Sequence, residues 1–275
     1  CASGPPWNVM KVALLQIRVT GGETEKNETR AHEALERGIE ASADLLVLPE
    51  LWNVGYFATE AYQTVAEPLD GPTLSRISEV ARKNDVWILA GSIIEDLQQT
   101  ITTTPAEDGY SNTSVLFDPG GNRRATYRKH HLFGYESAES ELLVPGQRLE
   151  TAEIGGFTVG ITTCYDLRFP ELYRELTDRG VTMVLVPSAW PYPRVEHWET
   201  LTTTRALENL FYVVAVNGSG PAGGDGLIGR SRVIDPWGTA VRTAGPEAET
   251  LLIDVEPDRV KEIRDEFPAL TDRRF

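Results

Sequence analysis

The chain has 275 residues and a formal net charge of −15, with 41 acidic residues against 26 Lys and Arg. Nucleic-acid binders must neutralise phosphates with Lys and Arg, so this charge argues against a nucleic-acid partner. No stretch approaches the ~18 consecutive apolar residues of a membrane-spanning helix, and we expect a soluble protein without a membrane partner.

The sequence contains two cysteines, Cys1 and Cys164, too few for the disulfide framework of a small secreted protein. We therefore expect a reducing, cytoplasmic location. Residues 1–9 lack the charged and apolar regions of a signal peptide, and an apolar strand pattern opens at Met10. We interpret 1–9 as an N-terminal extension, natural or added, and 10–275 as a single domain; a lipid anchor on Cys1 is the alternative.

Short apolar runs alternate with helical patterns along the first half, which is typical of an α/β fold. The pattern predicts strands over 12–17, 44–49, 86–94, 114–117 and 123–127, with helices over 24–43 and 74–83. The polar stretch 98–109 is predicted as a hairpin loop, and Asp118-Pro-Gly-Gly as a turn.

The second half repeats this plan. Strands are predicted over 157–163, 181–187, 211–217, 231–234 and 250–255, with helices over 170–177, over 195–208 and from 257 onward. No change in composition and no linker rich in Pro or Gly divides the chain.

Three residues stand where chemistry is often found. Cys164 lies between a strand and a helix, where a nucleophile can be exposed and where helix N–H groups favour a thiolate and an oxyanion. Glu50 follows an apolar strand, in surroundings that would raise the pKa of a general base. Lys129 lies in a cationic run. Each alone has an ordinary alternative: a buried structural cysteine, a loop carboxylate and a surface charge.

Together they belong to four ordered motifs, and the sequence thereby resembles the nitrilase superfamily of carbon–nitrogen hydrolases, most closely its amidase branch with the omega-amidases. The motifs are Leu48-Pro-Glu-Leu-Trp, Tyr127-Arg-Lys-His-His-Leu-Phe-Gly, Cys164-Tyr-Asp-Leu-Arg-Phe-Pro-Glu and Arg205-Ala-Leu-Glu-Asn. The resemblance runs from about Met10 to the C-terminus. It implies an α/β fold, specifically a four-layer α-β-β-α sandwich, and a homodimer or larger homo-oligomer.

The resemblance also implies a catalytic triad of Glu50, Lys129 and Cys164 with a second glutamate. Glu139 and Glu141 both precede Pro145-Gly146, and the family spacing selects Glu139. Gly134 stands where the family commonly has an aspartate.

In the implied mechanism, Glu50 deprotonates Cys164, which attacks a small amide and forms a thioester. Lys129 and the backbone N–H of Tyr165 stabilise the oxyanion, and no cofactor or metal is required. The helices over 170–177, with Leu172, Tyr173 and Leu176, and from Val195 are candidate interface elements.

Several other functions compete with this interpretation. Cys164 could pair with His130 or His131, as in papain-like proteases, but the residues around it do not resemble the local signatures of those proteases. These histidines with Asp166 could bind zinc, although neither the spacing nor the second cysteine suits such a site. Within the superfamily, nitrilases and N-carbamoyl amino acid hydrolases share the triad, but nitrilases typically have Trp-Glu after the nucleophile, where Tyr165-Asp166 stands here. A non-catalytic interaction module with the same fold is a further alternative.

The segment from Ser188 to Arg194 is predicted to form a wall of the substrate pocket. Trp190 and Tyr192 would supply bulk, unless they are ordinary core residues. Arg168 or Arg194 would bind the carboxylate of a 2-oxo acid omega-amide, whereas a small aliphatic amide would need neither.

Overall fold

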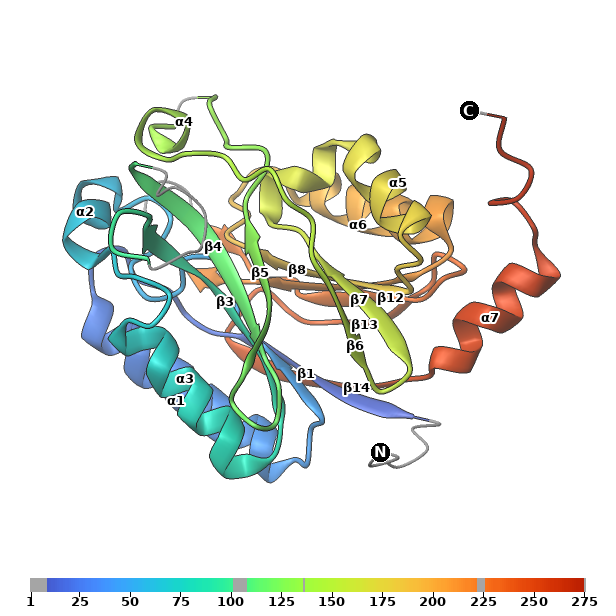
Figure 1. The fold of residues 1–275 in the computed structure, drawn as a ribbon, viewed down its shortest axis with the longest axis horizontal. Coiled ribbons are helices and arrows are strands. Elements are labelled where there is room, and N and C mark those ends of the chain that lie inside the picture. Colours follow the sequence, from blue (N-terminus) through green and yellow to red (C-terminus); the bar gives the residue numbers. More distant parts are fainter. Residues whose placement is uncertain (1–8, 101–107, 136, 222–225, 275) are drawn as a thin grey trace.

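A computed structural model describes residues 9–100, 108–135, 137–221 and 226–274. It contains two six-stranded sheets packed face to face, with helices on the outer face of each (Figure 1). Residues 1–8 of the predicted extension and 101–107 of the predicted hairpin loop lie outside the described residues.

The first sheet has the strand order β14-β1-β2-β3-β4-β5. Its strands β1, β2 and β3 run parallel, while β14, β4 and β5 join antiparallel. The strands are β1 (Met10–Gln16), β2 (Leu45–Val47), β3 (Trp87–Asp96), β4 (Tyr110–Phe117), β5 (Arg123–Arg128) and β14 (Glu249–Val255).

The second sheet has the order β13-β12-β9-β8-β7-β6. Here β7, β8 and β9 are parallel, and the flanking strands are antiparallel. The strands are β6 (Thr151–Ile154), β7 (Phe157–Ile161), β8 (Met183–Ser188), β9 (Tyr212–Asn217), β12 (Arg232–Ile234) and β13 (Ala240–Thr243). A separate two-stranded ribbon pairs β10 (Ser219–Gly220) with β11 (Leu227–Ile228).

Helices cover the two outer faces and make the four layers that the resemblance implied. In Figure 1, α1 (Thr24–Glu40) and α3 (Pro72–Asn84) lie against the first sheet, whereas α5 (Pro170–Asp178) and α6 (Val195–Asn209) lie against the second. Three apolar cores follow from these layers, one under each helix pair and one between the sheets. The remaining short helices are η1 (Thr59–Ala61), α2 (Tyr62–Val65), α4 (Glu139–Leu142) and η2 (Cys164–Arg168), and α7 (Pro257–Glu266) follows β14.

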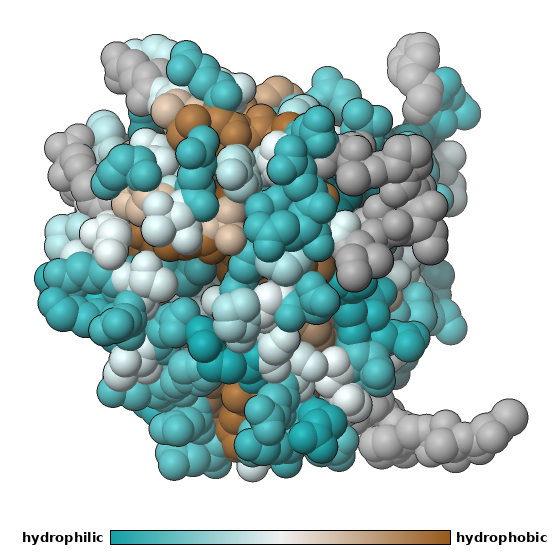
Figure 2. All heavy atoms as spheres, turned by 60° about the vertical axis from the view of Figure 1, so that its left-hand side comes forward, coloured by the Kyte–Doolittle hydropathy of each residue, from teal (hydrophilic) through white to brown (hydrophobic). Residues whose placement is uncertain are grey.

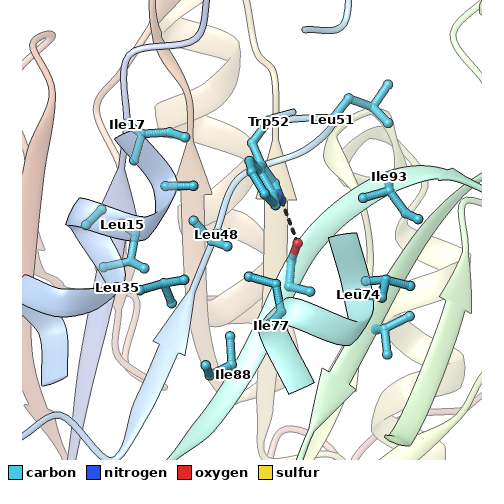
Figure 3. Close-up of a cluster of buried hydrophobic side chains, with 14 of the residues drawn as sticks. Leu15, Ile17, Leu35, Leu48, Leu51, Trp52, Leu74, Ile77, Ile88 and Ile93 are labelled. Atoms are coloured by element: carbon cyan, nitrogen blue, oxygen red, sulfur yellow. Dashed lines mark hydrogen bonds between the residues drawn. The ribbon is translucent and has the colours of Figure 1, made fainter. Parts of the chain in front are cut away.

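The core beneath α1 and α3 shows how the apolar spacing of the sequence builds a layer. Leu35 of α1 and Ile77 of α3 point from their helices toward the strand residues Leu15 and Ile88 (Figure 3). Trp52 is buried in the same cluster, and its indole N–H donates to the carbonyl of Ala90 over 2.7 Å. The indole therefore fixes the chain directly after Glu50 against β3.

The main elements occur where the sequence predicted them, and the predicted fold class is confirmed. Three differences stand out. Strand β4 begins at Tyr110, four residues before its predicted start, and the edge strands β6 and β13 were not predicted. Strand β13 is exposed along its whole length, so its sequence lacks the apolar alternation of a half-buried strand.

Hydrophilic side chains cover most of the face seen in Figure 2, and hydrophobic residues appear there only in small separate patches. Among the helices in the described ranges, none combines the length and apolarity needed to cross a bilayer.

Candidate active site

Three of the predicted residues form a buried ionic cluster. The Lys129 ammonium lies 2.8 Å from Glu50 Oε1 and 2.9 Å from each carboxylate oxygen of Glu139. None of the three side chains is exposed to solvent. Cys164 lies beside the cluster: it lines the same cavity as Lys129, and Glu50 and Lys129 are the charged groups that act on its thiol.

The cluster joins the two sheets. Glu50 and Lys129 follow β2 and β5 of the first sheet, whereas Cys164 follows β7 of the second. The backbone N–H of Ala189, after β8 of the second sheet, donates to Glu50 Oε2 over 2.8 Å. The carboxyl ends of parallel strands are where α/β sheets place ligands, and here two such edges meet.

Burial is the largest influence on Glu50 and raises the pKa of its carboxyl group. Lys129 opposes this effect, and the negative charge of Glu139 adds to it. Burial alone would lower the pKa of Lys129, but Glu139 and Glu50 outweigh it and hold that pKa well above its usual value. Two carboxylates thus share one permanent cation, so Glu50 can take up a proton while Lys129 stays charged.

Cys164 has a strained backbone, with φ of 48°, at the first position of the 3-10 helix η2. This position presents the side chain at the sheet edge, as the sequence predicted. The expected preference for a thiolate is wrong, because burial and the neighbouring Glu50 raise the pKa of the thiol well above its usual value. The thiol therefore needs a base to remove its proton.

The geometry distinguishes the two candidates for the second glutamate. Glu139 is fully buried and accepts hydrogen bonds from the Tyr56 hydroxyl and the backbone N–H of Phe133 in addition to Lys129. Glu141 is exposed, two residues further along the same short helix.

The histidines belong to a neighbouring network. His131 Nδ1 lies 2.7 Å from Asp166 Oδ1, and its ring stacks on Phe169. Asp166 also accepts from the hydroxyl of Tyr127 and the backbone N–H of Thr163. The Asp166 carboxylate thus braces the turn beside Cys164. Within the described ranges, no group of three or more His, Cys, Asp or Glu side chains could hold a metal ion, so the zinc alternative gains no support.

A cavity of about 310 Å³ opens beside Cys164 and Lys129. The predicted pocket residues Arg168, Trp190, Tyr192 and Arg194 all line it, as does Tyr165. Ala189, Pro191 and Pro193 of the predicted wall line it as well. Its lining also includes residues that were not predicted to form the pocket, namely Tyr56, Phe57, Phe133 and Tyr135.

The two pocket arginines rest on aromatic rings. The Arg168 guanidinium lies 5.2 Å from the ring centre of Trp190, and that of Arg194 lies 5.6 Å from the ring of Phe133. Neither forms an ion pair with an acidic side chain in the part of the chain that the structure describes. Both charges are therefore available to an anionic group in the cavity.

Asn112 and Tyr56 contact the cluster but were not predicted. The Asn112 amide donates to both Glu50 and Glu139, and the Tyr56 hydroxyl donates to Glu139. Burial, with the charge of Glu139, raises the pKa of Tyr56, so its hydroxyl stays a donor. The polar run 110–114 contains Asn112 and looks like solvent-facing sequence. The one signal of burial was the apolar segment that follows this run in the same strand, which ends at Phe117.

This fold and site define the chain as a cysteine-dependent hydrolase of carbon–nitrogen bonds other than peptide bonds. It belongs to the carbon–nitrogen hydrolase family, whose profile matches residues 11–265. The chain is similar to the 2-oxoglutaramate amidase of Paenarthrobacter nicotinovorans, with 37% identity over 98% of this chain and 91% of that protein. It is 31% identical to the Omega-amidase NIT2 of Mus musculus, over 97% and 96% of the two chains.

Solved structures agree. Nit3 of Saccharomyces cerevisiae, described as a member of branch 10 of the nitrilase superfamily, superposes with a TM-score of 0.86 and 29% identity over the whole of both chains. A mutant amidase of Nesterenkonia sp. AN1 gives a TM-score of 0.81 with 27% identity over 98% of this chain and 95% of that one. Its active-site cysteine carries the acetamide moiety of fluoroacetamide. The predicted superfamily and its amidase branch are thereby confirmed.

Proposed function

We propose that the chain is an amidase that converts a small carboxamide into a carboxylic acid and ammonia through a thioester on Cys164. The observation that carries the proposal is the buried cluster of Glu50, Lys129 and Glu139 beside Cys164, with Cys164 and Lys129 in the lining of one cavity. Relatives that are named as amidases, and that match this chain over nearly their full length, support the same reaction.

Acylation follows from the positions of the charged groups. The Glu50 carboxylate takes the thiol proton, and the sulfur of Cys164 attacks the amide carbon. The oxygen of the tetrahedral intermediate gains negative charge, which the Lys129 ammonium and the backbone N–H of Tyr165 stabilise. Glu50 then gives its proton to the departing nitrogen, so that ammonia leaves and the thioester remains.

Hydrolysis of the thioester uses the same base. Glu50 takes a proton from a water molecule, whose oxygen attacks the thioester carbon. The carbon–sulfur bond breaks, the acid leaves, and the proton returns to Cys164. Glu139 holds Lys129 in place without exchanging protons, because it bonds the ammonium through both of its oxygens.

The preferred substrate in this proposal is the omega-amide of a 2-oxo dicarboxylic acid. Such a molecule carries an anionic carboxylate at the end opposite its amide. Arg168, Arg194 and Cys164 all line the cavity, and a guanidinium pairs well with a carboxylate. Neutral short amides should also react, with weaker binding.

A substrate panel tests this proposal. Ammonia release is compared for 2-oxoglutaramate, propionamide, an N-carbamoyl amino acid and a simple nitrile, and mass spectrometry follows the acyl adduct on Cys164. Arg168→Met and Arg194→Met should each raise the KM for 2-oxoglutaramate by about tenfold or more and leave propionamide nearly unchanged. Turnover of only the nitrile or the carbamoyl compound would contradict the amidase assignment.

We also infer that the chain forms a homodimer. The predicted contacts Leu172, Tyr173 and Leu176 of α5 are buried against the second sheet and are not available. The helix α6 instead exposes Leu207, which lies beside the turn that carries Trp237. Light scattering should give a mass above the 30.4 kDa of one chain, and Leu207→Glu should lower it.

A cytoplasmic location fits the chemistry of the proposed nucleophile. The mechanism needs a reduced thiol at Cys164, which is maintained in reducing compartments. Fractionation of cells that express the protein should recover it with cytoplasmic markers.

A further inference from the structure

Asn112 lies at the centre of the ionic cluster without being charged itself. It belongs to β4 and is fully buried. Its amide nitrogen donates to Glu50 Oε1 over 2.8 Å and to Glu139 Oε1 over 3.1 Å. Its backbone carbonyl accepts the N–H of Lys129 over 2.9 Å. One residue therefore contacts all three members of the charged cluster.

The orientation of this amide is fixed by its neighbours. If the group were flipped, its oxygen would face the oxygens of Glu50 and Glu139, and lone pairs would oppose lone pairs. In the observed orientation the Asn112 oxygen is buried and has no hydrogen-bond partner among the described residues. An unpaired buried oxygen is costly, so the two bonds to the carboxylates must outweigh that cost.

The charge of the cluster explains why a second donor is needed. Two carboxylates and one ammonium leave an excess negative charge in a site closed to solvent. Lys129 and Asn112 both donate to Glu50 Oε1 and to Glu139 Oε1, so the two donors bridge the same pair of oxygens. The Asn112 amide is a donor without charge, so it holds the two carboxylates together and does not change the net charge of the site.

We propose that Asn112 is a positioning residue that keeps Glu50 ionised and aligned with the Cys164 thiol. The proposal rests on the proposed role of Glu50 as the base. It adds a residue that lies outside the four motifs and does not line the cavity. Asn112 consequently acts through Glu50 and should affect the chemical step more than substrate binding.

The other groups that face Glu50 come from several elements. Lys129 donates to Oε1 and also to Glu139, and the backbone N–H of Ala189 donates to Oε2. Glu139 and the Cys164 thiol also act on the Glu50 carboxylate. The Tyr56 ring lies 5.4 Å from the Lys129 ammonium. All of these groups remain when Asn112 alone is replaced, so a change in the protonation of Glu50 can be assigned to the missing amide.

Asn112→Leu tests the proposal, because leucine keeps the volume and removes both donors. A hydrogen bond to a charged group stabilises the charge by an amount that corresponds to about one pH unit or more. The acidic limb of the profile of kcat/KM against pH should therefore move upward by about one unit, with kcat reduced at neutral pH and KM nearly unchanged. The rate at which iodoacetamide alkylates Cys164 is measured against pH by peptide mapping. The acidic limb of this second profile should also move to higher pH.

Thr113→Val is the matched control. Thr113 is the next residue of β4 and is also fully buried, and its hydroxyl donates over 2.7 Å to the carboxylate of Glu95, outside the cluster. The control thus removes a buried hydrogen bond to a glutamate from the same strand. It should lower thermal stability and leave the acidic limb where it is in the unmodified protein.

A folded Asn112→Leu protein with the acidic limb and kcat of the unmodified protein would overturn the proposal. If that variant does not fold, Asn112→Asp decides, because it has nearly the same shape and replaces the donor by a carboxyl group. Its acidic limb should also move upward, and an unmoved limb would again overturn the proposal. Glu50→Gln distinguishes failure of the proposed function from failure of the Asn112 proposal. An active Glu50→Gln protein would refute Glu50 as the base, whatever the Asn112 variants show.

Discussion

Replacing Lys129 by methionine removes the only cation that touches both buried glutamates among the described residues. The two ion pairs, at 2.8 and 2.9 Å, each correspond to ~6 kcal/mol of Coulomb attraction at an effective dielectric constant of about 20. Desolvation of the ammonium offsets much of this gain, and removal of one partner of a buried pair typically costs ~3–5 kcal/mol. Lys129→Met should lower the free energy of unfolding by about that amount at neutral pH.

The loss should depend on pH in a defined direction. Lys129 lowers the pKa of Glu50, so without it the pKa of Glu50 in the folded state rises further above its unfolded value. The folded variant then holds a proton that the unfolded chain releases, and its stability falls as the pH rises through the raised pKa. Denaturant unfolding at pH 5 and at pH 8 should therefore show the larger deficit at pH 8.

Catalysis should suffer as well as folding. Loss of one group that stabilises an oxyanion typically lowers kcat by about 10²- to 10³-fold, and protonation of Glu50 would add to this. Arg128→Met is the control, because Arg128 pairs with the buried Glu95 over 2.8 Å and is adjacent in sequence. It should be destabilised as well, yet it should release ammonia at nearly the normal rate per folded molecule.

One result would refute this reasoning. A folded Lys129→Met protein with normal turnover would mean that the ammonium does not stabilise the transition state. His131→Ala should keep substantial activity, since its ring contacts Asp166 and Phe169. If His131→Ala were inactive and Lys129→Met active, a cysteine–histidine mechanism would replace the one proposed.

Three further predictions follow from single contacts. Glu139→Gln should lower kcat at least tenfold and Glu141→Gln should not, because only Glu139 bonds the ammonium; equal activities in the ammonia assay would contradict this. Burial raises the pKa of Glu50, and the base must be ionised, so kcat/KM should already fall on acidification at a pH above 4.5; a profile flat down to that pH would exclude Glu50 as the base. Gly91→Ala should be more destabilising in thermal unfolding than Gly22→Ala. Both have positive φ, but a side chain at 91 would meet the Pro49 carbonyl at 2.0 Å and one at 22 would meet nothing within 4 Å.

Sequence patterns predicted the parts of the fold that depend on apolar periodicity. Helix α1 buries Ala31, Ala34, Leu35 and Gly38, which are four of the five residues expected on its inner side. Strand β8 is buried at every position, in accord with its continuous apolar run. The structure brings the motif residues Glu50 and Lys129 together with Glu139, since Glu50 and Lys129 follow strands of the same sheet.

The polar interior could not be predicted in the same way. Residues 111–114 read Ser-Asn-Thr-Ser, and local rules assign such a run to a loop. In the structure all four are fully buried, because each has a polar partner on another element, among them Glu50 for Asn112 and Glu95 for Thr113. Lys129 likewise resembles a surface charge until its two glutamates are known. These partners are remote in sequence, so only the tertiary fold reveals them.

The separation of the nucleophile from its base has a consequence for how the protein tolerates change. Cys164 is carried by one sheet and Glu50 by the other, so the apolar side chains between the sheets set the spacing of the two reactive groups. The volumes of residues such as Leu14 and Val214 thus help to set the distance between the thiol and the carboxylate. A larger or smaller side chain there should alter the rate of the reaction without contacting the substrate.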